Sequence, residues 1–227
     1  MGGLRAFAAE LAGTFALTLA AAGAVCMDAA TGARLGPLGV SLSYAAAMTA
    51  AYYAFPGQIC RFNPALTLAD LVVRRTPWMG GVFALAAQLL GAVCAGLFLH
   101  AVLSGGKPEL LGAPAFLGSC QPNGISYRAA TLVEAVLTFF LACTVFASAP
   151  RRRRALGPMA VGACALFGGL SAGPLTGAAM NPARAFGPAL VSGYWNSHYV
   201  YWVGPLAGAI LAALIAPHLV HEENHPL

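Results

Sequence analysis

The chain has 227 residues, of which 59% are hydrophobic and only 8% are charged, and its mean hydropathy is +0.74. Because soluble domains carry about 25% charged residues, this composition excludes an ordinary soluble protein and indicates an integral membrane protein. The net charge of +5 does not indicate a nucleic-acid partner, since four of the basic residues form one run, Arg151–Arg154, between apolar segments and without interleaved aromatic residues.

Apolar windows of about 19 residues predict six membrane-spanning helices. The first window has the length of a secretory signal peptide, but Glu10 in its middle argues against the apolar core that such a peptide needs. In chain order, the predicted spans lie near residues 6–26, 37–55, 80–103, 129–149, 157–173 and 199–220.

The basic residues of the loops predict the orientation of these spans. With both termini in the cytoplasm, eight basic residues fall on the cytoplasmic side and three on the outer side, as the positive-inside rule requires. We therefore expect a multi-pass protein with both termini cytoplasmic, most simply in the plasma membrane. The cytoplasmic set is Arg5, Arg61, Arg74, Arg75 and Arg151–Arg154, and the outer set is Arg34, Lys107 and Arg128.

Two Asn-Pro-Ala triplets, Asn63-Pro64-Ala65 and Asn181-Pro182-Ala183, each predict the start of a helix. Asn is a good N-cap, and Pro at the first helical position loses only an N–H that would have stayed unpaired. After the first triplet, the apolar run to Val73 predicts a helix of about 11 residues, or about 16 Å. That length is close to half of the hydrocarbon core, which is about 30 Å thick.

An internal repeat relates the two halves of the chain. Glu10-x-x-x-Thr14-Phe15 recurs as Glu134-x-x-x-Thr138-Phe139, and each copy precedes one of the triplets. Each half thus has three spans with a half-helix after the second span. Because three is odd, the second half begins on the opposite side of the membrane, so the halves are inverted repeats.

The predicted organisation is one transmembrane domain over residues 1–227, with repeats 1–105 and 126–227 joined by an outer loop, 106–125. The two half-helices enter from opposite faces, and their N-termini meet near the midplane. Non-helical backbone at that depth is tolerated only where it is buried or lines a water-filled cavity. This arrangement is typical of a pore or a transporter.

Several motifs occur together in a fixed order. They are the two triplets, Met180–Pro188 around the second triplet, Gly173–Gly177 before it, Tyr201–Pro205 after it, Gln88 in the third span, and the paired Glu10 and Glu134. This set resembles the aquaporin and glycerol-facilitator family, the major intrinsic proteins, over nearly the whole chain. The resemblance implies an all-α membrane protein with six transmembrane helices and two re-entrant half-helices, which passes water passively as a homotetramer and is not an enzyme.

Within this fold, two facing helix N-termini place partial positive charge at the centre, which would reject cations and hydronium. A water molecule could accept hydrogen bonds from the amides of Asn63 and Asn181, although both residues could also be helix caps alone. Arg184 is an intramembrane charge, and such residues usually face a cavity and serve function. The resemblance makes it the outer filter residue; the alternative is a charge that reaches the outer interface.

The resemblance places the rest of the selectivity filter by position, at Tyr44, Gly169 and Ala178 beside Arg184. Tyr44 could instead be a packed core aromatic. This set would be wider than the aromatic, His, Cys and Arg set of strict water channels.

The resemblance gives mixed signals on the permeant. Gly169 is the choice of glycerol facilitators, whereas Ala185, Ala189 and the pair Tyr201-Trp202 match water channels. We therefore expect water as the main permeant and leave small neutral solutes such as hydrogen peroxide, ammonia and glycerol open.

Glu10 and Glu134 are intramembrane carboxylates with two interpretations. They could relay protons, as in a proton-coupled inverted-repeat transporter. The family instead implies that each accepts hydrogen bonds from backbone N–H groups of a re-entrant loop. Asp70 at the end of the first half-helix is expected to pair with Arg74 or Arg75.

The stretch Gly57–Phe62 departs from the family pattern, since it is shorter and lacks a His that lines the inner vestibule. Arg61 stands there instead and could narrow the inner mouth, gate it, or add a second positive barrier. A non-conducting structural relative is therefore a further alternative.

No group of residues suggests catalysis. The six cysteines and five histidines show no metal-ligand spacing, and no phosphate-binding loop or nucleophile–base pair is present in the sequence. We expect no catalytic residues, no metal and no cofactor.

Overall fold

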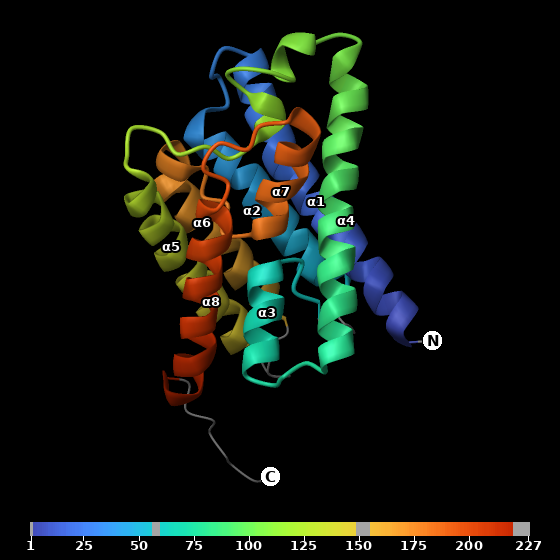
Figure 1. Cartoon of the computed structure of the whole chain (residues 1–227), viewed down its shortest axis with the longest axis vertical. Helices are drawn as coiled ribbons and strands as arrows, with labels where there is room; N and C mark the ends of the chain where they lie inside the picture. The colour runs from blue at the N-terminus through green and yellow to red at the C-terminus, as the bar shows by residue number, and fades with distance from the viewer. Residues whose placement is uncertain (1, 56–59, 149–154, 220–227) are drawn as a thin grey trace.

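The structure is a computed structural model that describes residues 2–55, 60–148 and 155–219 (Figure 1). The Arg151–Arg154 run and residues 57–59 of the altered stretch therefore lie outside the described residues. The long helices are α1 (Gly2–Ala30), α2 (Gly36–Ala54), α4 (Trp78–Ser104), α5 (Tyr127–Ser148), α6 (Gly157–Thr176) and α8 (Val200–Leu219); the short ones are α3 (Pro64–Val72) and α7 (Pro182–Ser192).

The predicted all-α fold is confirmed, since the described residues contain helices and 3-10 turns but no strands. Each predicted span coincides with one of the six long helices, with ends that differ by a few residues. Among the described helices, α1, α4, α5 and α6 are long and apolar enough to cross a membrane by length and hydropathy alone.

The first half-helix is shorter than predicted. It has nine residues rather than about 11, because the chain turns after Val72 and Arg74 adopts a left-handed backbone conformation with φ of +57°. The second half-helix, α7, has 11 residues and ends at Gly193, whose φ is +72°.

The helices pack in two matching sets. α1 packs against α4, and in the same way α5 packs against α8. Each of these sets also contacts the half-helix of the other half of the chain, α4 with α7 and α8 with α3. α2 and α6 pack against each other. Glycines allow the closest crossings: a Cβ at Gly91 of α4 would lie 2.3 Å from the Leu11 carbonyl oxygen, and one at Gly208 of α8 would lie 2.0 Å from the Ala135 carbonyl oxygen. Both substitutions would force the backbones apart.

α3 and α7 lie one below the other along the long axis of the molecule, between the long helices (Figure 1). The segment between α4 and α5 contains the 3-10 turns η1 (Pro108–Leu110) and η2 (Phe116–Gly118), and η2 contacts both α1 and α7. It covers the end of the molecule at which α7 lies, opposite the end at which α1 begins (Figure 1).

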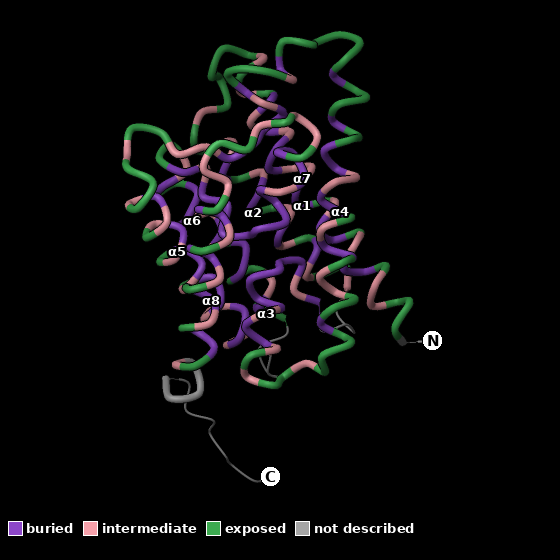
Figure 2. The backbone as a smooth tube through the Cα atoms, in the orientation of Figure 1, coloured by how far each residue is buried: buried purple, intermediate pink, exposed green. Residues whose placement is uncertain are grey.

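The burial pattern suits a bilayer rather than water. The buried positions follow the centre of the helical assembly (Figure 2), and they include the polar side chains of both triplets. Large apolar side chains lie instead on the outer surface, among them Leu132 at 65% exposure and Leu38 at 59%. Contiguous exposed apolar surface is rare on soluble monomers and marks an interface with lipid or protein.

Candidate pore

Each Asn-Pro-Ala triplet is hydrogen-bonded to the residue that precedes the other triplet. The Asn63 Nδ2 group donates a hydrogen bond to the Met180 carbonyl at 2.7 Å, and the Asn181 Nδ2 group donates to the Phe62 carbonyl at 2.8 Å. Both asparagines are fully buried. The structure thus brings together two residues 118 positions apart, with each amide bound to the residue that precedes the opposite asparagine.

Each asparagine also caps the helix that it opens. Asn63 Oδ1 accepts from the Ala65 N–H at 2.9 Å, and Asn181 Oδ1 accepts from the Ala183 N–H at 3.0 Å. Pro64 and Pro182 take the first helical position, where the missing N–H removes no hydrogen bond. The unpaired ends of two helices therefore face one point, and each contributes about half a positive charge.

The residues before the asparagines have an unusual backbone. Phe62 and Met180 adopt φ values of +53° and +51°, a region that is costly for residues other than glycine. This conformation turns each carbonyl toward the opposite loop, where the asparagine amide binds it. Such strain persists only where surrounding contacts hold it in place.

Glu10 holds the first of these loops. Its carboxylate accepts from the backbone N–H groups of Arg61 at 2.8 Å and Phe62 at 2.7 Å, and from the Gln88 side chain at 2.9 Å. Gln88 also donates to the Thr67 hydroxyl at 2.8 Å, which links α1, α3 and α4. A carboxylate from one helix therefore satisfies two backbone donors that have no partner within a helix.

Glu134 makes the equivalent contacts in the second half. Its carboxylate accepts from the N–H groups of Ala179 at 3.0 Å and Met180 at 2.8 Å, and from the Thr176 hydroxyl at 2.7 Å. It is fully buried. The two carboxylates thus each bind the strained residue that precedes an asparagine.

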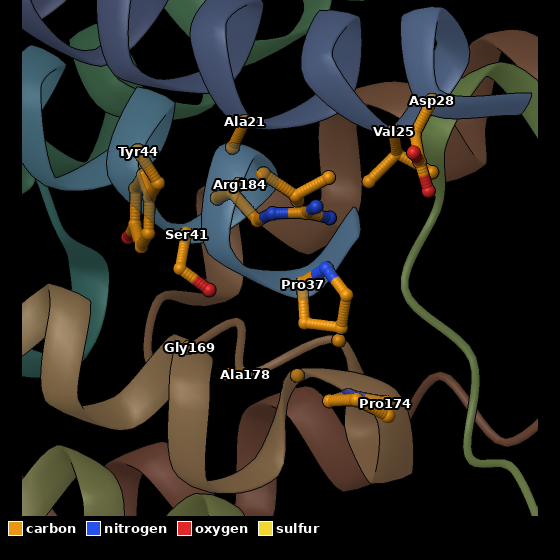
Figure 3. A pocket seen from close by; sticks show the side chains of 13 residues that line it. Ala21, Val25, Asp28, Pro37, Ser41, Tyr44, Gly169, Pro174, Ala178 and Arg184 are labelled. Carbon is orange, nitrogen blue, oxygen red and sulfur yellow. The ribbon is translucent and has the colours of Figure 1, made fainter. Parts of the chain in front are cut away.

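A cavity of about 270 Å³ opens between Ala178 and Arg184, which flank the second triplet in sequence, and residues of α1 and α2 (Figure 3). All four residues that the sequence placed in the filter, Tyr44, Gly169, Ala178 and Arg184, line it. Tyr44 lines the cavity and also packs within the buried core, and its hydroxyl donates to the Ala179 carbonyl at 3.3 Å. The remaining lining residues come from α1, α2 and the end of α6: Ala21, Val25, Asp28, Pro37, Val40, Ser41, Gly173, Pro174 and Gly177.

The Arg184 side chain extends into this cavity (Figure 3) although it is only 3% exposed. Its Nη1 group donates to the Gly118 carbonyl at 3.2 Å and to the Cys120 sulfur. Burial raises the pKa of the Cys120 thiol to about 12, although the Arg184 charge opposes this shift. The thiol therefore stays neutral, and no carboxylate among the described residues forms an ion pair with Arg184.

A second cavity of about 540 Å³ adjoins the first on the side of the loop between α4 and α5. Arg184, Val25, Gly173, Pro174 and Gly177 line both cavities. Arg184 therefore stands where the two cavities meet.

Arg61 lies two residues before the first triplet. The structure shows that it, and not Arg74 or Arg75, is the partner of Asp70. Arg61 Nε pairs with Asp70 Oδ2 at 2.5 Å, whereas neither Arg74 nor Arg75 forms an ion pair with Asp70 within the described chain. The reason is the early end of α3 at Val72, after which Arg74 adopts a left-handed backbone conformation, so that Arg74 and Arg75 do not continue the helix that carries Asp70. Arg75 instead places its guanidinium 4.9 Å from the centre of the Phe146 ring.

The comparisons with known proteins agree with this geometry. The family model for major intrinsic proteins matches residues 1–216. The chain belongs to the major intrinsic protein family. As a member of this family, it is an integral, multi-pass membrane channel rather than an enzyme.

Relatives of this major intrinsic protein include several plant aquaporins. The chain is 40% identical to the probable aquaporin TIP3-2 of Oryza sativa subsp. japonica, over 99% of this chain and 85% of the relative. It is 38% identical to aquaporin NIP1-1 of the same organism, over 96% of this chain and 75% of the relative. The aquaglyceroporin from Plasmodium falciparum superposes with a TM-score of 0.83 at 22% identity, covering 94% of this chain and 95% of that chain, which supports the shared fold.

The sequence of this major intrinsic protein predicted no role for some of the residues around the filter. Asp28 lines the cavity and accepts from the Gly36 N–H at 2.9 Å. Cys120 and Gly118 contact Arg184 from a loop more than 60 residues earlier in the chain, so no sequence spacing links them. Ser41, by contrast, lies three residues before Tyr44, a spacing that puts both on one helix face.

The Arg61–Asp70 pair gives a testable prediction. Asp70→Ala leaves a largely buried guanidinium without its counter-ion, so we expect the free energy of unfolding to fall by about 3 kcal/mol. Thermal unfolding of the purified protein in detergent measures the loss. Arg74→Ala is the matched control and should have little effect; a loss as large as that of Asp70→Ala would contradict the observed pairing.

Proposed function

We propose that this protein is a passive channel for water that also admits small neutral solutes and excludes protons and ions. The observation that carries the proposal is the reciprocal bonding of Asn63 and Asn181, each to the residue before the other, next to a cavity lined by Arg184. The names of the plant relatives support water as the main permeant. Hydrogen peroxide, ammonia and glycerol are the neutral solutes that the wide filter would admit.

The asparagine amides serve as donors to the permeant in this proposal. Each amide group has two N–H donors, and the protein uses one of them for the carbonyl of the opposite loop. The second donor of each amide is then available to a water oxygen. A water that accepts from both asparagines cannot at the same moment accept from neighbouring waters, which interrupts a proton-conducting chain.

Ion exclusion rests on positive charge at two levels. The facing helix N-termini supply about one positive charge in total at the triplets. Arg184 supplies a full charge at the outer cavity, without a carboxylate partner among the described residues. A cation that has lost its water would meet both fields in a medium of low dielectric constant.

Arg61 has a different role in the proposal. Its pairing with Asp70 neutralises its charge, and its guanidinium lies 5.5 Å from the centre of the Phe146 ring. This disfavours a second positive barrier among the three alternatives that the sequence left open. We infer that Arg61 shapes and narrows the inner mouth.

Stopped-flow light scattering on proteoliposomes tests the channel. We expect osmotic shrinkage several times faster than that of protein-free vesicles, and no change on addition of a protonophore, because no step is driven by protons. A solute uptake that collapses with the protonophore would favour the rival proton-coupled transporter. Correctly assembled protein without any water flux would favour the non-conducting alternative.

The proposal includes the assembly and orientation. We propose a homotetramer with a pore in each protomer, on the basis of family membership and of the exposed apolar surface. We place both termini in the cytoplasm because α1 begins at the same end of the molecule as the Arg74–Arg75 turn (Figure 1), and we keep the plasma membrane as the proposed location. Chemical cross-linking and protease protection of terminal tags test these points.

A further inference from the structure

The Ser41 hydroxyl is a polar group in the cavity to which nothing has so far given a role. Ser41 is 5% exposed and lies one helical turn before Tyr44 on the same face of α2, after Pro37. Its oxygen points into the cavity (Figure 3). It has no hydrogen-bond partner among the described residues, whereas Ser43, two residues further on, donates to the Ala20 carbonyl at 3.1 Å.

Gly169 on α6 is what leaves this hydroxyl uncovered. A Cβ built on Gly169 would lie 2.5 Å from Ser41 Oγ and 2.7 Å from Ser41 Cβ, distances that no real Cβ contact allows. Any larger residue at this position would displace the serine or cover it. The Ser41 hydroxyl is therefore open to the cavity only because residue 169 is a glycine.

Ser41 complements Arg184 in chemistry. The guanidinium can only donate hydrogen bonds, whereas a serine hydroxyl both donates and accepts. A permeant that accepts from Arg184 needs an acceptor for its own hydrogens. The Tyr44 hydroxyl and the Asp28 carboxylate line the same cavity but already bind the Ala179 carbonyl and the Gly36 N–H, whereas the Ser41 hydroxyl binds nothing among the described residues. The hydroxyl of Ser41 meets this need.

We propose that Ser41 is a further selectivity residue, which exchanges hydrogen bonds with the permeant while Arg184 donates to it. The inference rests on the proposed channel function and concerns how the filter admits the neutral solutes proposed there, such as glycerol, which carry both donor and acceptor groups. These solutes lose several water molecules on entry, so each hydrogen bond in the filter lowers their barrier. Water is small enough to keep its hydrogen bonds with neighbouring waters.

Ser41→Ala tests the proposal in proteoliposomes, with glycerol, urea and water as the probes. We expect glycerol and urea permeability to fall about threefold to tenfold, the equivalent of one hydrogen bond, while water permeability changes less than about twofold. Ser43→Ala is the matched control, since the Ser43 hydroxyl lies on the same helix but donates to the Ala20 carbonyl. This variant should leave the ratio of glycerol to water permeability unchanged.

A second variant tests the position of the side chain directly. Ser41→Cys places a thiol in the cavity, so a small methylthiosulfonate reagent added from outside should slow water flux more in this variant than in wild type.

The outcomes separate this inference from the function on which it rests. Wild-type protein without water flux would overturn the channel itself. Wild-type water flux with the same solute-to-water ratio in Ser41→Ala, or no added block in Ser41→Cys, would overturn the role of Ser41 alone.

Discussion

Glu134→Leu is expected to prevent stable folding of the second re-entrant loop. The substitution removes the acceptor for three donors, the Ala179 and Met180 N–H groups and the Thr176 hydroxyl. Each buried donor left without a partner costs about 1–3 kcal/mol, so the total is comparable with the whole stability of many domains, about 5–15 kcal/mol. The Met180 backbone, with φ of +51°, would also lose the contact that holds it.

The yield of monodisperse protein and its thermal unfolding in detergent measure this effect. Glu109→Leu is the control, because the Glu109 side chain is 61% exposed in the loop between α4 and α5 and should tolerate the change. Glu10→Leu should resemble Glu134→Leu, since Glu10 binds the first loop in the same way.

The conservative substitution separates the two interpretations of the carboxylates. Glu134→Gln puts an NH₂ group against at least one backbone donor, so a supporting role predicts lower stability with unchanged dependence on protons. A proton relay predicts a stable protein whose transport no longer responds to a proton gradient. Stable Glu134→Gln protein with lost coupling would therefore contradict the structural role.

The parts of the fold that could be predicted from the sequence depend on local chemistry or on the repeat. Asn followed by Pro determines a helix start without tertiary contacts, and both α3 and α7 begin at that point. The paired positions of Glu10 and Glu134 indicated equivalent contacts, because an inverted repeat places the same residue in the same environment twice.

The parts that could not be predicted depend on where a chain turns or on contacts across the fold. The partner of Asp70 follows from the end of α3 at Val72, and a composition window does not locate a helix end to within two residues. Cys120 contacts Arg184 only because the loop between α4 and α5 folds over α7. The role that we propose for Ser41 required the close approach of α6 at Gly169, which no pattern in α2 records.

Arg184→Val is expected to have the largest effect on selectivity. Two unit charges about 4 Å apart repel by about 4 kcal/mol at an effective dielectric constant of about 20. Because this repulsion forms part of the barrier to cations, removal of the guanidinium should raise the permeability to small cations by at least about tenfold. Glycerol should also pass faster, because valine leaves the cavity wider. Proteoliposomes loaded with a pH-sensitive dye report proton flux, and an ion-sensitive dye reports cation flux.

Arg184→Lys is the matched control because it keeps the charge but loses the planar fork that reaches Gly118 and Cys120. We expect it to retain most of the cation exclusion while it loses discrimination among neutral solutes. Charge and geometry are thereby measured separately at one position.

The proton flux through Arg184→Val also shows which of the two barriers, Arg184 or the Asn63 and Asn181 region, contributes more to proton exclusion. Cation leakage with continued proton exclusion would place the proton barrier at Asn63 and Asn181, where the helix N-termini still supply positive charge and the amides still interrupt the water chain. Leakage of both would make Arg184 the dominant barrier. Unchanged exclusion of both cations and protons in a variant with normal water flux would contradict the role of Arg184, since its charge has no carboxylate partner in the described structure that could already have cancelled it.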